Sequence, residues 1–448
     1  MFPSCEEPVA RDRVKRGVMS SAQPSSERPT FAQALRFWLK LGFISFGGPT
    51  GQIAIMHTEL VDRKRWISES RFLHALNYCM LLPGPEAQQL ATYSGWLLHG
   101  TLGGIAAGAL FVLPSAVLLW ALSWVYVSHG NVAVIASMFD GLKPAVVAIV
   151  AVAVIRIGRR ALKAPVAWLL AGLAFAAIAV FDVPFPLLIF AAGGVGLLLH
   201  REFGSPLTDS RDSLIATDSD GTDSRFMIRR SVRLIIVCGL LWFAPVAMLA
   251  AWLGGDHTIV REGVFFSNAA MVTFGGAYAV LPYVAQQAVD HYGWLSGAQM
   301  IDGLGLAETT PGPLIMVVQF VGFVAAWHHP GGLSPFAAAT LGTATTVWVT
   351  FVPCFLWILL GAPYIERLRS HGRLNGALSA ITAAVVGVIL NLAVWFAGHA
   401  LWTDSGAVDL PAMLFALLLF AGMARWHWPI HWTVAAGVLF GLIGWATS

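Results

Sequence analysis

Two glycine- and proline-rich motifs each occur twice in the chain, 228 positions apart, inside apolar segments. The Phe-Gly-Gly sequence of residues 46–48 returns at 274–276, and the Pro-Gly-Pro sequence of residues 83–85 returns at 311–313. Proline and glycine interrupt helices, because proline lacks an amide hydrogen and glycine adopts backbone angles closed to other residues. A helix that restarts inside a membrane presents unpaired amides and behaves as about half a positive charge. These motifs predict a small-oxyanion site where the broken helices of two repeats meet.

The predicted anion site consists of the motifs and the polar residues beside them. Its glycines and prolines are Gly47, Gly48, Pro49, Pro83, Gly84, Pro85, Gly275, Gly276, Pro311, Gly312 and Pro313. Its side-chain hydrogen-bond donors are Gln88, Gln89, Thr309 and Thr310. Structural roles explain the same residues, since glycine and proline permit kinks and polar side chains hydrogen bond between membrane helices. The matched spacing of the two copies favours a binding site.

Ionisable residues flank the Pro-Gly-Pro motifs. Glu86 follows the first motif and Glu308 precedes the second. Ionisable groups inside a membrane are costly and mark functional sites, so both carboxyl groups are candidates for binding a coupling proton. Glu86 has an alternative role as the cap of a helix that begins there. Arg36 and Lys40 lie four residues apart on one helix face, and they either attract the anion at the cytoplasmic mouth or extend to the interface.

The composition is that of a polytopic helical membrane protein. Of 448 residues, 57% are hydrophobic and 11% charged, whereas a soluble protein has roughly 25% charged residues. Apolar segments must be helical in lipid, where backbone groups cannot stay unpaired. The net charge of +3 gives no reason to expect a nucleic-acid partner. Four scattered cysteines, and histidines without metal-ligand spacing, predict neither a metal nor another cofactor.

The chain divides into two related halves. We expect a polar cytoplasmic tail (1–30), an N-terminal transporter repeat (31–200), a hydrophilic cytoplasmic linker (201–230), a linking transmembrane helix (231–254) and a C-terminal transporter repeat (255–448). The apolar elements are expected at about 31–56, 71–99, 101–127, 131–155, 165–181 and 183–200, and again at about 262–286, 297–327, 333–361, 374–400, 409–424 and 430–447. An even number of crossings in the first repeat plus one linking helix inverts the second repeat.

Basic residues predict the topology, because cytoplasmic loops are rich in Lys and Arg. Basic clusters near 156–163, 225–233 and 367–373 agree with a cytoplasmic N-terminus and an external C-terminus. The Arg-Lys-Arg run at 63–65 agrees only if the elements before and after it are re-entrant, which leaves nine crossings instead of thirteen. We therefore favour re-entrant or broken helices in an all-α fold with two inverted repeats and about 9–13 membrane segments.

At these motifs the chain resembles the bacterial chromate ion transporter family in its long-chain, two-domain form. The resemblance covers Thr30 to about Leu401 and rests on FGGPTGQIAIMH, PGPEAQQLATYSGW, TFGGAYAVLPYVAQQAV, MIDGLGLAETTPGPLI and QFVGFVAAW. It implies a multi-pass protein of the bacterial inner membrane that exports chromate from the cytoplasm and so confers chromate resistance. The family's motifs map onto residues 46–49, 83–89, 274–276 and 308–313.

The sequence thus favours a secondary active transporter that exports chromate by alternating access. Sulfate is nearly the same tetrahedral dianion, so a permease that takes up or exchanges sulfate or another oxyanion is the alternative. A chromate-reducing membrane enzyme is disfavoured, because no flavin, nicotinamide or haem fingerprint is present. A sensor without transport activity would not need two inverted copies. The coupling ion and the formation of a homodimer in the bilayer are left open.

Overall fold

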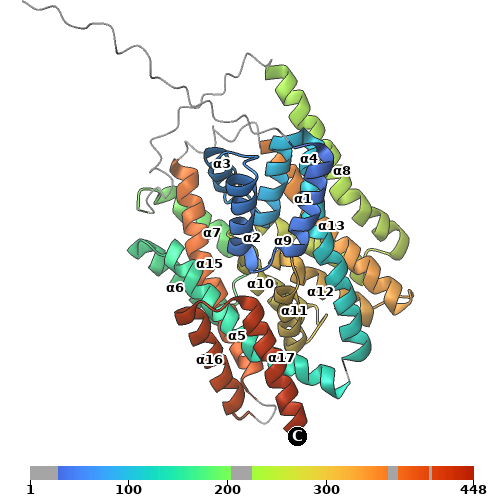
Figure 1. Ribbon diagram of the computed structural model, residues 1–448, viewed down its shortest axis with the longest axis vertical. Coiled ribbons are helices and arrows are strands. Elements are labelled where there is room, and N and C mark those ends of the chain that lie inside the picture. Colours follow the sequence, from blue (N-terminus) through green and yellow to red (C-terminus); the bar gives the residue numbers. More distant parts are fainter. Residues whose placement is uncertain (1–28, 131, 203–223, 362–371, 403–405, 448) are drawn as a thin grey trace, which may run out of the picture.

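The computed structural model describes residues 29–130, 132–202, 224–361, 372–402 and 406–447, and this part of the chain is helical (Figure 1). The first half contains α1 (Phe31–Ile44), α2 (Gly48–His57), the π-helix η1 (Thr58–Arg63), α3 (Glu69–Cys79), α4 (Glu86–His129), α5 (Ala133–Ala161), α6 (Pro165–Phe181) and α7 (Phe185–Leu198). The second half contains α8 (Ser224–Leu253), α9 (Thr258–Val272), α10 (Ala277–Ala285), the π-helix η2 (Gln286–His291), α11 (Gly297–Thr309), the 3-10 turn η3 (Leu314–Met316), α12 (Val317–His328), α13 (Pro335–Gly361), α15 (Gly372–Ala400), α16 (Leu410–Trp426) and α17 (Ile430–Thr447).

Six of the described helices are long and apolar enough to cross a membrane, namely α4, α5, α8, α13, α15 and α17. Shorter apolar helices include α6, α7 and α16. The protein is therefore an all-helical, multi-span membrane protein, as its composition predicts. Of the expected tail (1–30), residues 1–28 lie outside the described residues, and of the expected linker (201–230), residues 203–223 do. Helix α8 begins at Ser224, inside the expected linker.

Helices are interrupted at all four repeated motifs. In the first half α1 and α2 are separated by the Phe-Gly-Gly turn, and α3 and α4 by the Pro-Gly-Pro turn. In the second half the same turns separate α9 from α10 and α11 from η3. The glycines adopt positive φ angles, which disfavour other residues: 122° at Gly84 and 112° at Gly312. The breaks therefore follow from the residue types at these turns.

The two halves repeat the same backbone irregularities. Each contains a π-helix of six residues, η1 and η2, directly after the helix that follows the Phe-Gly-Gly turn. Both α6 and α16 have 17 residues, and each ends at a left-handed residue, Asp182 or His427. Helices α5 and α15 are both 29 residues long. The structural repeat thus extends beyond the segments in which the sequences visibly match.

Each half also contains an antiparallel helix pair. Helix α4 reverses direction at His99 and Gly100, where φ is −137° and 64°. Its two arms approach closely, because a β-carbon on Gly95 would lie 2.4 Å from the carbonyl oxygen of Gly103. Helices α12 and α13 form the equivalent pair, in which a β-carbon on Gly342 would lie 2.8 Å from the carbonyl oxygen of Gly322.

Reciprocal hydrogen bonds join the breaks of the two halves. The amide of Gly84 donates to the carbonyl of Thr273 at 2.7 Å, and the amide of Gly312 donates to the carbonyl of Ser45 at 2.8 Å. Ser45 and Thr273 directly precede the two Phe-Gly-Gly turns. Each Pro-Gly-Pro turn is therefore fastened to the Phe-Gly-Gly turn of the other half.

A long helix of each half also packs against helices of the other half. Helix α5 packs against α16 and α17 of the second half, and α15 packs against α6 and α7 of the first. Helix α8 contacts α9 and α13 and lies at the edge of the molecule in Figure 1. The core is consequently formed by both halves together.

Replacing either central glycine by alanine should destabilise the protein. In Gly84→Ala the new β-carbon would lie 2.7 Å from the sulfur of Cys354, and in Gly312→Ala 2.6 Å from Cβ of Ser115. The positive φ angle alone costs about 1–3 kcal/mol. We expect a lower midpoint of thermal unfolding in detergent for both variants. Gly172→Ala, whose β-carbon meets no atom within 4 Å, is the control. Wild-type midpoints in both central variants would contradict this structural role.

Candidate functional site

A cavity of about 700 Å³ lies between the two halves. Both Phe-Gly-Gly turns contribute to its wall, together with the last turns of α5 and the first turns of α15. Of the predicted site residues, the structure places six in this wall: Gly47, Gly48, Pro49, Glu86, Gly275 and Gly276. The cavity therefore joins residues that are more than half the chain apart.

Two helices begin at the wall of this cavity. Helix α2 follows Gly47, whose φ is 91°, and α10 follows Gly276, whose φ is 93°. Neither helix start has a side-chain cap, so the amides of the first turns keep their partial positive charge, apart from Pro49 of α2, which has no amide hydrogen. Thr50 and Tyr278, at equivalent positions in these first turns, add hydroxyl groups to the wall. Both helix starts can thus donate hydrogen bonds to an anion.

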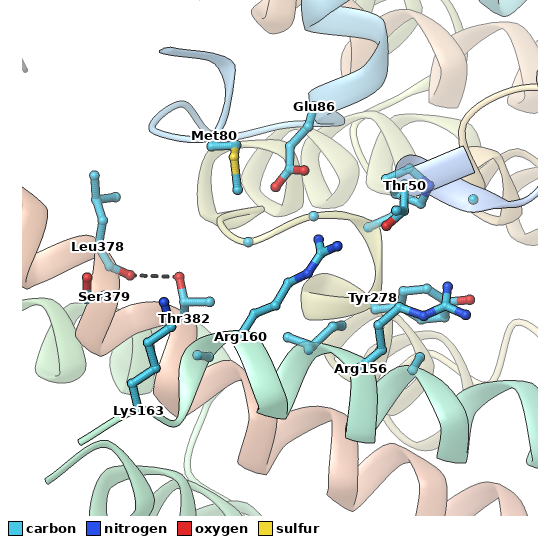
Figure 2. Close-up of a pocket in the computed structure, with 18 of the residues that line it drawn as sticks. Thr50, Met80, Glu86, Arg156, Arg160, Lys163, Tyr278, Leu378, Ser379 and Thr382 are labelled. Atoms are coloured by element: carbon cyan, nitrogen blue, oxygen red, sulfur yellow. Dashed lines mark hydrogen bonds between the residues drawn. The ribbon is translucent and has the colours of Figure 1, made fainter. Parts of the chain in front are cut away.

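Two arginines of α5 extend into the same cavity. Arg156 and Arg160 are four residues apart and share one helix face, whereas Arg159 does not line the cavity. In Figure 2, Arg160 extends toward Glu86 and Arg156 lies beside Tyr278. Neither arginine forms an ion pair with any described residue. Two guanidinium groups without a paired carboxylate make the cavity attractive to an anion.

The sequence reasoning missed this role for the arginines. It treated the basic cluster at 156–163 as a cytoplasmic loop, but α5 continues to Ala161. The apolar run of α5 ends near residue 155, but the helix continues for about two more turns. The basic side chains of these turns face a polar cavity. Their spacing of four residues was the signal that could have revealed a shared helix face.

The two predicted coupling carboxylates differ in position. Glu86 lines the cavity, and its Oε1 lies 3.8 Å from the place that a β-carbon on Gly276 would take. Glu308 is buried and accepts a 2.5 Å hydrogen bond from the hydroxyl of Tyr278. It is therefore connected to the cavity through Tyr278 and is not part of the wall.

At the Pro-Gly-Pro turns the amides of the central glycines are already hydrogen bonded, whereas α4 begins after the first of these turns without a side-chain cap. Binding of the anion at these turns stays a prediction. The amides of Gly84 and Gly312 are bonded to the carbonyls that the Phe-Gly-Gly breaks leave without a helical partner. Neither glycine lines the cavity, and the same holds for the prolines beside them, Pro83, Pro85, Pro311 and Pro313. These turns hold the two halves together, and the other pair of turns faces the cavity.

The predicted side-chain donors are engaged in local hydrogen bonds. Gln88 donates to the hydroxyl of Thr92 at 3.1 Å, and Gln89 donates to the carbonyl of Pro83 at 2.7 Å. The hydroxyls of Thr309 and Thr310 donate to carbonyls of α11, their own helix. None of the four lines the cavity, so direct contact with a substrate stays a prediction. Arg36 and Lys40 are exposed and also lie outside the cavity wall.

Comparison with known proteins identifies the family. The family described as "Chromate transporter" matches residues 32–197 and 262–444, which cover both halves of the structure. The chain belongs to the chromate transporter family. It is accordingly a transporter and not an enzyme.

Several relatives match over most of their length. A chromate transport protein of Pseudomonas aeruginosa is 32% identical over 93% of this chain and 92% of its own. A chromate transport protein of Cupriavidus metallidurans is 28% identical over 92% of this chain and 93% of its own. An uncharacterized transporter of Methanocaldococcus jannaschii is 25% identical over 82% of this chain and 85% of its own. No solved structure matches the chain.

Removing the hydroxyl of Tyr278 should destabilise the protein. Tyr278→Phe leaves the buried carboxyl of Glu308 without its hydrogen-bond donor, which costs about 1–3 kcal/mol. We expect a lower thermal midpoint in detergent than for the wild type. Tyr292→Phe is the matched control, since no described residue hydrogen bonds to its hydroxyl. Equal midpoints for the two variants would show that the hydrogen bond between Tyr278 and Glu308 does not stabilise the folded protein.

Proposed function

We propose that this protein is a secondary active transporter of the inner membrane that exports chromate, a tetrahedral oxyanion, from the cytoplasm by alternating access. Two relatives that match over nearly the whole chain are named chromate transport proteins. The observation that carries the proposal is the cavity in which Arg156 and Arg160 lie unpaired beside the starts of α2 and α10.

The dianion would bind between the guanidinium groups and the two helix starts. A guanidinium group presents planar N–H donors that match the oxygens of an oxyanion, and a helix N-terminus adds amide donors with partial positive charge. The glycines at the turns leave no side chain over these amides, since a β-carbon on Gly48 would meet no atom within 4 Å. Thr50 and Tyr278 supply further hydroxyl donors at the same wall.

Glu86 would control occupancy of this site through its charge. An ionised Glu86 repels a dianion and competes with it for Arg160, whereas a protonated Glu86 leaves both arginines to the substrate. Glu308 would act on the same site through its hydrogen bond to Tyr278. Protonation of one of these two carboxyl groups, Glu86 or Glu308, is the coupling step that we propose. A proton that leaves with the dianion lowers the exported charge from two to one.

The membrane potential provides a driving force for export. Moving one charge through 100 mV is worth about 2.3 kcal/mol, and a dianion gains twice that amount. An inside-negative potential therefore drives chromate outward. Export requires no ATP site.

We further propose that the halves are inverted repeats, 31–200 and 255–448, joined by the transmembrane helix at 231–254. The reciprocal bonds of Gly84 and Gly312 and the exchanged packing of α5 and α15 support a two-fold relation between them. In this arrangement α1–α2 and α3 with the first arm of α4 are re-entrant from the cytoplasm. The equivalent elements of the second half are re-entrant from outside, which leaves nine crossings.

Labelling at equivalent loops tests the inversion. Lys64 is exposed and directly follows η1, and His291 is exposed and is the last residue of η2. Lys64→Cys should react with a membrane-impermeant maleimide only from the cytoplasmic side, and His291→Cys only from outside. A parent chain with Cys5→Ser, whose remaining Cys79, Cys238 and Cys354 are buried, gives the background. Reaction of both positions from one side would refute inverted repeats.

Transport into and out of proteoliposomes tests the substrate and the site. Loss of one charge-assisted hydrogen bond costs about 1.5–3 kcal/mol, which corresponds to about ten- to hundredfold in affinity. We expect Arg156→Gln and Arg160→Gln each to weaken chromate binding at least tenfold and to reduce chromate efflux. Arg159→Gln, on the neighbouring helix face, is the matched control.

Two outcomes would contradict the proposal. Wild-type chromate efflux by the well-folded double variant of Arg156 and Arg160 would remove the site. Transport of labelled sulfate that chromate does not inhibit would instead favour the alternative, a sulfate permease with the same fold.

A further inference from the structure

A second cavity, of about 190 Å³, lies at the other end of α15. The large cavity reaches α15 at Asn375 to Thr382, whereas the small one reaches it at Asn391 to Trp395. Thr382 and Asn391 are nine positions apart on the helix, which is about 14 Å. The end of α6, the start of α7, the end of α10 and η2 complete the wall of the small cavity.

The side of the small cavity formed by α6, α7 and α15 is the structural counterpart of one side of the large cavity, whereas its α10 and η2 residues have no counterpart in the large wall. Helices α5 and α15 align from end to end, with Ala145–Val147 matching Ala384–Val386, and α6 aligns with α16 through their left-handed ends. In this alignment five residues of the small wall take the positions of residues in the large wall. The pairs are Asn391 with Val152, Leu392 with Ala153, Trp395 with Arg156, Ile178 with Met423, and Phe185 with Ile430.

We propose that the small cavity is the external release site of the oxyanion, the counterpart that the second repeat builds for the cavity of the first. This inference rests on the proposed function. Asp182 follows α6, whose other end adjoins Lys163 in the large cavity, so the small cavity faces the side of the membrane opposite to the large one. The structure thus represents the state that is open to the cytoplasm, with its external counterpart nearly closed.

The charges of the two cavities favour movement of the dianion from the large cavity to the small one. The large wall contains three basic residues, Arg156, Arg160 and Lys163, and two acidic residues, Glu86 and Glu202. The small wall contains Asp182 and Asp290 and, among the described residues, no lysine or arginine. Trp395 occupies the position equivalent to Arg156. A dianion is therefore attracted on the cytoplasmic side and repelled outside, which lowers its external affinity and promotes release.

The experiment places a removable block in the small cavity of the full-length protein. Ala179, a small residue of the small wall, is replaced in Ala179→Cys and treated with a membrane-impermeant, positively charged methanethiosulfonate from outside. Asn391→Cys repeats the test from α15. We expect labelling from outside only, faster labelling during chromate efflux, at least a tenfold loss of efflux after labelling, and recovery when a reductant removes the label.

Chromate binding to the cytoplasmic cavity is measured on the same labelled protein and should stay within twofold of the unlabelled value. Val408→Cys, an exposed position in the external loop after α15, is the control that should keep its efflux when labelled. Full labelling of Ala179→Cys and Asn391→Cys with unchanged efflux would overturn the release site. So would labelling only from the cytoplasmic side.

A wrong release site and a wrong proposed function would give different results in this experiment. If the protein does not transport chromate, unlabelled wild-type protein shows neither chromate binding nor efflux. If only the release site is wrong, binding and efflux both persist after the label is attached.

Discussion

The structure depends on backbone hydrogen bonds that neither half can make alone. Helices α1 and α9 are followed by Ser45 and Thr273, whose carbonyls lack a helical partner. The amides of Gly84 and Gly312 in the opposite halves provide those partners. The carbonyl of Ser45 also accepts a 3.3 Å hydrogen bond from the side chain of Gln52 in its own half. An unpaired backbone group in lipid costs several kcal/mol, so the turn of one half stabilises the break of the other half. The interrupted helices and the pairing of the repeats are therefore a single constraint.

This constraint also decides which helix ends remain for a ligand. The Pro-Gly-Pro turns are used in joining the halves, whereas the starts of α2 and α10 face the large cavity without side-chain caps. Helix α5 brings Arg156 and Arg160 to the same wall. The glycine amides of the Pro-Gly-Pro turns are thus hydrogen bonded within the protein. The Phe-Gly-Gly turns leave amide donors and positive charge at the large cavity. We propose that an oxyanion provides the acceptor that this second pair of turns lacks.

The sequence predicts the local structure well and the partners of each break poorly. Proline at the start and a long apolar run place α6 at Pro165–Phe181, as expected from the sequence, and the Gly and Pro residues mark all four breaks. Which break faces the cavity depends on hydrogen bonds between distant residues, such as Gly84 and Thr273. The spacing of residues along the sequence does not predict which residues form these bonds. Arg156 and Arg160 were interpreted as loop residues because a basic cluster marks the cytoplasmic side whether it lies in a loop or in a last helical turn.

The central claim is that a dianion binds between α5 and the starts of α2 and α10. The most direct measurement is anomalous X-ray scattering from chromium in crystals of the full-length protein grown with chromate. The account predicts one chromium peak in the large cavity, within hydrogen-bond reach of the guanidinium groups of Arg156 and Arg160 through the chromate oxygens. A peak at the Pro-Gly-Pro turns, or beside Arg36 and Lys40 with the cavity empty, would contradict it.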